Sequence, residues 1–78
     1  MALRELFVTK GCPHCREMRE WLEFKNADFI EYDVEEDRAA LARMRALANG
    51  QRTVPILVED GKVVQVGWQG HGCIVSAE

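Results

Sequence analysis

The stretch Gly11-Cys12-Pro13-His14-Cys15 restricts most strongly what this chain can fold into. A short apolar run, Leu6-Phe7-Val8, comes before it and is typical of a strand covered on both faces. After Pro13 the apolar residues recur with helical spacing, and proline suits the first turn of a helix because its missing N–H is not needed there. The pattern therefore predicts a strand, a tight turn and a helix whose N-terminus carries a thiol.

The rest of the chain continues this alternation. We expect strands over residues 4–9, 29–34, 54–59 and 62–66, and helices over residues 13–25 and 38–48. Asp37 is a plausible cap of the second helix, Asn49-Gly50 a stop signal and Asp60-Gly61 a hairpin turn. Strands joined by a helix should be parallel, whereas the hairpin strands should be antiparallel. The order predicts a single α/β domain over residues 1–78 with a mixed four-stranded sheet.

Two segments have weaker patterns. The end of the chain, from Gly67 to Cys73, is too rich in glycine to predict a helix, and residues 74–78 should form one short turn or none. In the second helix, Arg38, Arg43 and Arg45 fall outside the apolar stripe, which is typical of a solvated face.

Composition excludes several classes of function. The chain has 78 residues and a formal net charge of -3, which argues against nonspecific nucleic-acid binding. No apolar run approaches the roughly 20 residues that span a bilayer, so we expect no membrane association. The N-terminus shows no secretory signal, so we expect a cytoplasmic protein, in which cysteines are more often catalytic or metal-bound than structural. The three cysteines also cannot form a closed disulfide framework.

The two cysteines of the Cys-Pro-His-Cys motif should differ in reactivity. A thiolate is the nucleophile in disulfide exchange, and a helix N-terminus lowers the pKa of a thiol. Cys12 has that position, and Lys10 and His14 add positive charge that would tune its pKa further. Cys15 falls on the apolar stripe one turn later and should be partly buried. The spacing therefore predicts that Cys12 attacks a disulfide and that Cys15 resolves the mixed disulfide.

A metal site is the alternative from a different class. A single Cys-X-X-Cys pair can be half of a zinc site, which needs a second pair of ligands. Here Cys12 and Cys15 would be joined by His71 and Cys73, and the protein would be a structural or interaction module. The uncommon spacing of His71 and Cys73 and the β-α-β context favour redox chemistry with no bound metal.

With these residues in view, the chain resembles the glutaredoxins of the thioredoxin superfamily. The resemblance covers residues 3 to about 68 and is carried by Phe7-Val8-Thr9-Lys10-Gly11-Cys12-Pro13-His14-Cys15, Asp33-Val34, Thr53-Val54-Pro55 and Asp60-Gly61. It implies a minimal thioredoxin-like fold of the glutaredoxin type, with a third helix that is short or absent.

The resemblance also implies roles for several residues. Lys10 would hold a substrate carboxylate, and Thr53 and the backbone of Val54 would pair with an extended thiol substrate as an added strand. Pro55 would follow a cis peptide bond and face the active cysteine. Gly67-Trp68 resembles the NrdH-type redoxins, which take electrons from thioredoxin reductase, and we include both residues among the substrate-binding candidates.

The tail contains a further candidate. Gly70-His71-Gly72-Cys73 resembles the end of a bacterial glutaredoxin-like subfamily whose glycine-rich loop carries cysteine or selenocysteine. We hypothesise that Cys73 is a third redox thiol that exchanges with Cys12.

The sequence as a whole predicts a monomeric thiol–disulfide oxidoreductase that binds no cofactor and acts on disulfide-containing proteins or glutathione. Its electrons would come from glutathione or from thioredoxin reductase and NADPH. An iron–sulfur carrier built from dimers that use Cys12 and glutathione is a weaker alternative, because the second thiol and Pro13 argue against it.

Overall fold

The computed structural model describes residues 3–75, which alternate between strands and helices in the predicted order and add one more strand at the end. The first half contains β1 (Arg4–Val8), α1 (Pro13–Phe24), β2 (Ile30–Asp33) and α2 (Arg38–Leu47). The second half contains β3 (Thr53–Val54), β4 (Ile56–Glu59), β5 (Lys62–Val66) and β6 (Cys73–Ile74).

The main sheet has four strands in the order β2-β1-β4-β5. β1 and β2 are parallel, with Val8 opposite Asp33, as expected for strands joined through a helix. β4 runs antiparallel to β1, with Leu6 opposite Leu57, and β5 returns antiparallel to β4. The predicted mixed four-stranded sheet is confirmed.

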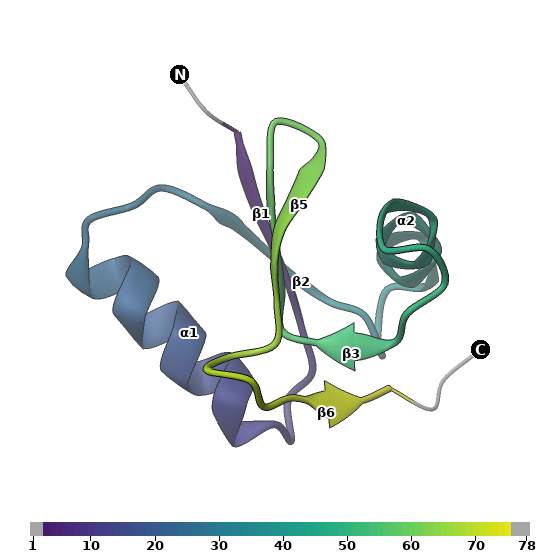
Figure 1. Cartoon of the computed structure of the whole chain (residues 1–78), viewed down its shortest axis with the longest axis horizontal. Coiled ribbons are helices and arrows are strands. Elements are labelled where there is room, and N and C mark those ends of the chain that lie inside the picture. The colour runs from purple at the N-terminus through teal and green to yellow at the C-terminus, as the bar shows by residue number, and fades with distance from the viewer. Residues whose placement is uncertain (1–2, 76–78) are drawn as a thin grey trace.

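The two helices cover opposite sides of the strands, so the core forms in two layers (Figure 1). On α1 the buried residues are Cys15, Met18 and Leu22, which are the stripe that the helical spacing predicted. On α2 the buried residues are Ala40, Leu41 and Met44. Both helices face β1 and β4, whose apolar residues are almost completely buried because each strand has protein on both faces.

Local signals set the ends of these elements. The Asp37 carboxylate accepts a hydrogen bond from the backbone N–H of Ala40 at 3.1 Å, which confirms it as the N-cap of α2. Asn49 and Gly50 both have positive φ, and helix α2 ends two residues before them. Asp60 and Gly61 also have positive φ (53° and 80°), as a primed hairpin turn between β4 and β5 requires.

The predicted strand over residues 54–59 is interrupted. The Val54–Pro55 peptide bond is cis, and the chain changes direction there, so that Thr53–Val54 leaves the main sheet as β3 while Ile56–Glu59 joins it as β4. Proline has no N–H for a sheet ladder, which is why the strand divides at this residue.

The tail differs from its prediction. Residues 73–74 form β6, which pairs antiparallel with β3. The sequence predicted a short turn or none from residue 74 onward and no strand at residue 73. A two-residue strand has no periodicity of its own, and its pairing depends on a partner some 20 residues away along the chain. Figure 1 shows β3 and β6 side by side, below the ends of the main strands. The rest of that prediction, for residues 76–78, lies outside the described residues.

Arg38 and Arg43 are exposed on α2, as the prediction of a solvated arginine face requires. Arg43 also has a specific partner that was not predicted, because its guanidinium binds the carboxylate of Glu5 on β1, and Glu5 is buried. Arg45 differs from the prediction, because its Nε is buried and has no hydrogen-bond partner.

The helices of the described part of the chain are α1 and α2, in agreement with the expectation of a short or absent third helix.

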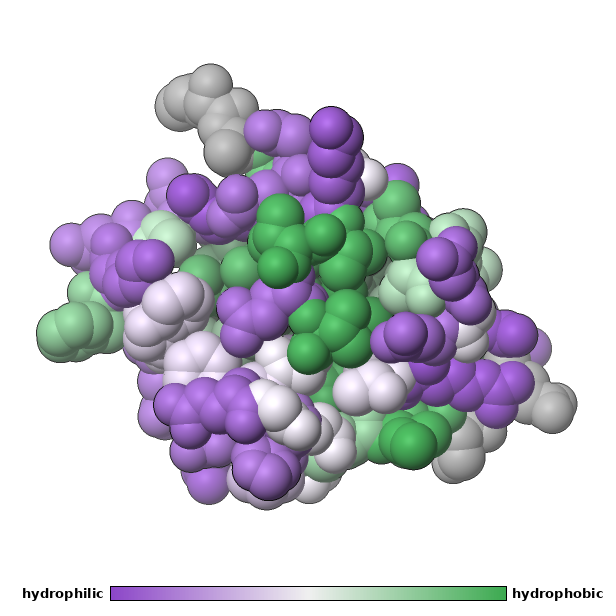
Figure 2. Space-filling model, viewed as in Figure 1, coloured by the Kyte–Doolittle hydropathy of each residue, from purple (hydrophilic) through white to green (hydrophobic). Residues whose placement is uncertain are grey.

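The edge strand of the main sheet has an exposed apolar surface. Val64 and Val66 on the edge strand β5 are 52% and 42% exposed, and Figure 2 shows apolar surface in the centre of the face where β5 runs.

Within residues 3–75, neither helix has the length and apolar character needed to cross a membrane.

Candidate active site

Cys12 lies where the sequence predicted, immediately before α1. Its backbone is extended, and its carbonyl accepts hydrogen bonds from the N–H groups of Cys15 and Arg16 at 3.2 and 3.4 Å. Pro13 takes the first helical position. No side chain caps this end of α1, so its N-terminal dipole acts on the Cys12 sulfur, where it would stabilise a thiolate.

Cys12 is joined by a disulfide to Cys73, which lies 61 residues further along the chain. The two Cα atoms are 6.0 Å apart. The structure thus brings together the predicted nucleophile and the thiol that the tail was predicted to supply.

Cys15 remains a free thiol and is buried, with 3% of its surface exposed. Burial raises its pKa above the ordinary value, and the negative charges of Glu31 and Asp33 raise it further. A hydrogen bond with the backbone of Thr9 acts in the opposite direction but is outweighed. Cys15 is therefore mainly a thiol at neutral pH.

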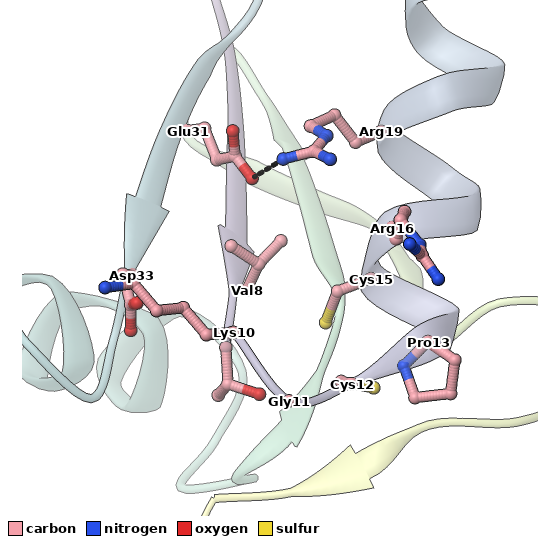
Figure 3. A pocket seen from close by; sticks show the side chains of 11 residues that line it. Val8, Lys10, Gly11, Cys12, Pro13, Cys15, Arg16, Arg19, Glu31 and Asp33 are labelled. Carbon is pink, nitrogen blue, oxygen red and sulfur yellow. Dashed lines mark ion pairs between the residues drawn. The ribbon is translucent and has the colours of Figure 1, made fainter.

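A cavity of about 580 Å³ opens beside these cysteines. It is bounded by the end of β1, the Lys10-Gly11 turn, the first turns of α1 and the outer strand β2 (Figure 3). An ion pair between Arg19 and Glu31, 3.7 Å long, lies across it. The full lining is Val8, Thr9, Lys10, Gly11, Cys12, Pro13, Cys15, Arg16, Arg19, Glu31 and Asp33.

Four charged groups of this lining were not predicted as site residues: Arg16, Arg19, Glu31 and Asp33. A signal for the two acids was present, because they are two residues apart on a strand and so share one face of it. The parallel pairing of β2 with β1 then places that face beside the start of α1.

The predicted cations beside Cys12 have partners of their own. The Lys10 ammonium is exposed and forms an ion pair with Glu36 at 2.8 Å, which raises the pKa of Lys10. The His14 ring lies 3.4 Å from the Glu17 carboxylate. Lys10 also lines the cavity, where a carboxylate ligand would compete with Glu36 for it, whereas His14 is not among the lining residues.

The loop after β5 lies against α1. The backbone N–H of Gly67 donates to the carbonyl of Pro55 at 2.7 Å, and Trp68 packs against Trp21 with ring centroids 5.4 Å apart. His71 stacks on His14 with centroids 5.5 Å apart. Trp68 thus contributes to packing against α1, and its predicted contact with substrate stays a prediction.

The predicted substrate edge is already paired. Thr53 lies opposite Ile74 and Val54 opposite Cys73, so the chain's own β6 holds the position predicted for an added strand. An extended substrate can pair with this same edge of β3 only after β6 has moved away.

The arrangement gives no support to the zinc alternative. Among residues 3–75, no group of three or more His, Cys, Asp or Glu side chains could hold a metal ion. Of the four ligands proposed for zinc, Cys12 and Cys73 are bonded to each other and cannot act as thiolates in this state.

Comparisons with known proteins agree on one family and one fold. The glutaredoxin family model matches residues 5–64. A glutaredoxin-like 8.6 kDa protein from the rubredoxin operon of Clostridium pasteurianum, itself uncharacterized, is 33% identical over 60 residues, covering 77% of this chain and 79% of that protein. A Synechocystis protein named as a probable glutaredoxin is 40% identical over 57 residues, covering 72% of this chain and 52% of that protein.

Solved structures of other proteins have a fold similar to that of this chain. The thioredoxin-like protein BC3987 superposes with a TM-score of 0.77 at 33% identity, covering 85% of this chain and 88% of that chain. A glutaredoxin from Archaeoglobus fulgidus superposes with a TM-score of 0.74 at 22% identity, covering 88% and 78% of the two chains, which shows the same fold.

Proposed function

Because the chain belongs to the glutaredoxin family, we propose that it reduces disulfides of proteins or mixed disulfides of glutathione, with Cys12 as the attacking thiol. Family and fold support thiol–disulfide redox chemistry, and the substrates and the electron donor are our proposal. The observation that carries this proposal is the position of Cys12 at the N-terminus of α1. Cys15 lies one turn away from Cys12, and Cys73 is bonded to Cys12.

In the reduced protein the Cys12 thiolate attacks one sulfur of the substrate disulfide. The substrate S–S bond breaks, one substrate thiolate leaves and takes a proton from water, and Cys12 forms a mixed disulfide with the other half. A second protein thiolate, from Cys15 or Cys73, then attacks the Cys12 sulfur and releases that half as a thiol. Two electrons pass from the protein to the substrate, and no bound cofactor is needed.

The cavity supports a charged thiol substrate. Lys10 and Arg16 provide positive charge for a carboxylate, whereas Glu31 and Asp33 provide negative charge for an amino group. A peptide thiol such as glutathione carries both kinds of group. We keep Lys10 as the carboxylate-binding residue, and Thr53, Val54, Pro55, Gly67 and Trp68 as the residues beside the reacting thiol.

Two coupled assays would identify the electron donor. The oxidised protein is mixed either with glutathione, glutathione reductase and NADPH, or with thioredoxin, thioredoxin reductase and NADPH, and NADPH consumption is followed with a protein disulfide as substrate. We expect turnover with one system. No turnover above background with either system, while the protein remains folded by circular dichroism, would contradict the proposed function.

The matched control is Cys12→Ser. It removes the attacking sulfur and should abolish turnover in whichever system reduces the wild type. Lys10→Ala tests the carboxylate contact separately: KM for glutathione mixed disulfides should rise while kcat changes little, since Lys10 would bind ground state and transition state alike.

A further inference from the structure

We propose that Cys73, and not Cys15, is the thiol that resolves mixed disulfides on Cys12, with strand β6 delivering it along the edge where substrate binds. The inference rests on the proposed function. It reassigns the role that the Cys-X-X-Cys spacing predicted for Cys15.

The first support is the backbone register. Val54 lies opposite Cys73 and Thr53 opposite Ile74, and the Val75 N–H donates to the Arg52 carbonyl at 2.9 Å. These backbone contacts do not involve sulfur. β6 can therefore place Cys73 beside Cys12 before any disulfide has formed.

The second support is the loop that leads to β6. A Cβ on Gly72 would lie 2.7 Å from the Val54 carbonyl oxygen, and a Cβ on Gly67 would lie 2.7 Å from the His71 carbonyl oxygen. Trp68 and His71 exchange two backbone hydrogen bonds, which close the loop into a tight turn. Glycine at both positions lets the loop come close enough for Cys73 to reach Cys12.

The third support joins the loop to α1. The His71 ring stacks on His14, which lies between the two cysteines of the motif. Together with β6, this contact holds the loop at the N-terminus of α1. Cys73 thus approaches the same end of the helix that stabilises the Cys12 thiolate.

Cys15 is less suited to the resolving step. It is buried, its thiol has a raised pKa, and an attacking sulfur must be a thiolate. Cys73 is only partly buried and lies in the short strand β6. Cys15 instead lines the cavity and packs with the α1 stripe.

The reaction balances as follows. The Cys12 thiolate forms a mixed disulfide with the substrate and expels one substrate thiolate. The Cys73 thiolate then attacks the Cys12 sulfur, the bond from Cys12 to the substrate breaks, and the second substrate thiolate leaves and is protonated by water. The product is the Cys12–Cys73 disulfide, and an external thiol donor reduces it again.

The β3 edge connects binding with release. An extended substrate that pairs with Thr53 and Val54 on the edge where β6 lies must displace β6, and the return of β6 must displace the substrate. Because β6 belongs to the same chain, its effective concentration at that edge reaches the millimolar range. Resolution by Cys73 and departure of the substrate backbone therefore occur together.

A single-turnover experiment tests the assignment. Reduced wild type, Cys12→Ser, Cys15→Ser and Cys73→Ser proteins are each mixed with less than one equivalent of the aromatic disulfide 5,5′-dithiobis(2-nitrobenzoate). Release of the coloured thiol is followed by stopped flow, and the products are identified by mass spectrometry after acid quenching. The first release reports attack by the protein, and the second reports resolution.

We expect wild type and Cys15→Ser to release two thiols per disulfide and to form the Cys12–Cys73 bond. Cys73→Ser should release the first thiol at the wild-type rate, which also shows that it is folded, and should slow the second release about a hundredfold or more. A rapid second release from Cys73→Ser, with a Cys12–Cys15 disulfide as product, would overturn the inference and leave the proposed function intact. If Cys12→Ser instead reacts as fast as wild type, the proposed function itself fails.

Discussion

Glu5 of β1 and Arg43 of α2 form a two-point ion pair, with Nη2 2.7 Å from Oε1 and Nε 3.1 Å from Oε2. Glu5 is 4% exposed, so this guanidinium is the partner of a buried carboxylate. The pair raises the pKa of Arg43, mainly through the hydrogen bond to Glu5. Strand β1 is thereby attached to α2 on the side of the sheet opposite α1.

Replacing Arg43 should weaken the fold. Arg43→Ala leaves the Glu5 carboxylate buried without its partner, and we expect a lower urea midpoint of unfolding. Arg43→Lys should recover only part of the loss, because an ammonium cannot bind both oxygens in the fork geometry. Arg38→Ala, at the exposed start of the same helix, is the control. Equal midpoints for Arg43→Ala and Arg38→Ala would show that the pair contributes nothing.

The core on the α1 side depends on Met18, which is fully buried. Met18→Ala should reduce the free energy of unfolding by about 2 to 5 kcal/mol, because it removes buried atoms and leaves a cavity. Met18→Leu keeps the volume and should cost less than about 1.5 kcal/mol. Phe24, 86% exposed near the end of the same helix, is the control, and its replacement by Ala should change stability by less than about 0.5 kcal/mol. Urea denaturation of the oxidised proteins measures all three.

Cys15 should react slowly and with a displaced pH profile. In the oxidised protein it is the free thiol, so iodoacetamide reports on it alone. Because burial raises its pKa, the midpoint of its alkylation rate should lie above the roughly 8.5 of an ordinary cysteine. Protein unfolded in urea should show the ordinary midpoint. A native midpoint at or below the ordinary value would contradict the described burial.

The raised pKa of Cys15 also makes the stability of the fold depend on pH. The unfolded chain loses the Cys15 proton at lower pH than the folded chain does, so the folded state binds more protons in between. The contribution of Cys15 to stability is complete below about pH 8.5 and declines as the pH rises toward its folded pKa. Cys15→Ser should lack this decline.

The close approach at Gly72 should be needed for β6. Gly72→Ala places a methyl group 2.6 Å from the Thr53 methyl and 2.7 Å from the Val54 carbonyl, so β6 must move away from β3. We expect the Cys12–Cys73 disulfide to form more slowly after reduction and to be reduced more readily by dithiothreitol. Gly11→Ala serves as a control for stability, because a methyl group at Gly11 would meet no atom within 4 Å. Gly50→Ala is unsuitable as a control, because the φ angle of Gly50 is positive and an alanine there would be strained. An unchanged rate of disulfide formation in Gly72→Ala would count against this role of the loop.

Much of this fold follows from local patterns. The apolar run of β1, the helical spacing after Pro13, the Asp37 cap and the Asp60-Gly61 turn each lie within a few residues, and each predicted its element. The features that escaped prediction depend on residues far apart in sequence. Arg43 lies outside the α2 stripe by helical spacing, and only the packing of α2 on β1 brings it to Glu5.

The candidate active site also has some features that local spacing predicts and others that depend on residues far apart in sequence. Spacing placed Cys12 before the helix and Cys15 on its buried stripe, and the structure agrees with both positions. Spacing could not decide which thiol lies next to Cys12, because that depends on the pairing of β3 with β6. The roles assigned to the cysteines stay predictions until the variants are measured.

The bond between Cys12 and Cys73 also changes the topology of the polymer. With a sequence separation of 61 in a chain of 78 residues, it converts most of the molecule from a line into a ring. A ring has far fewer unfolded arrangements, and by loop-closure entropy a bond of this span disfavours the unfolded state by about 4 kcal/mol. A bond between Cys12 and Cys15 would close only a few residues and would have a much smaller effect. The oxidised protein should therefore have a clearly higher Tm than its reduced form in calorimetry, and the redox state would set the temperature at which the chain unfolds.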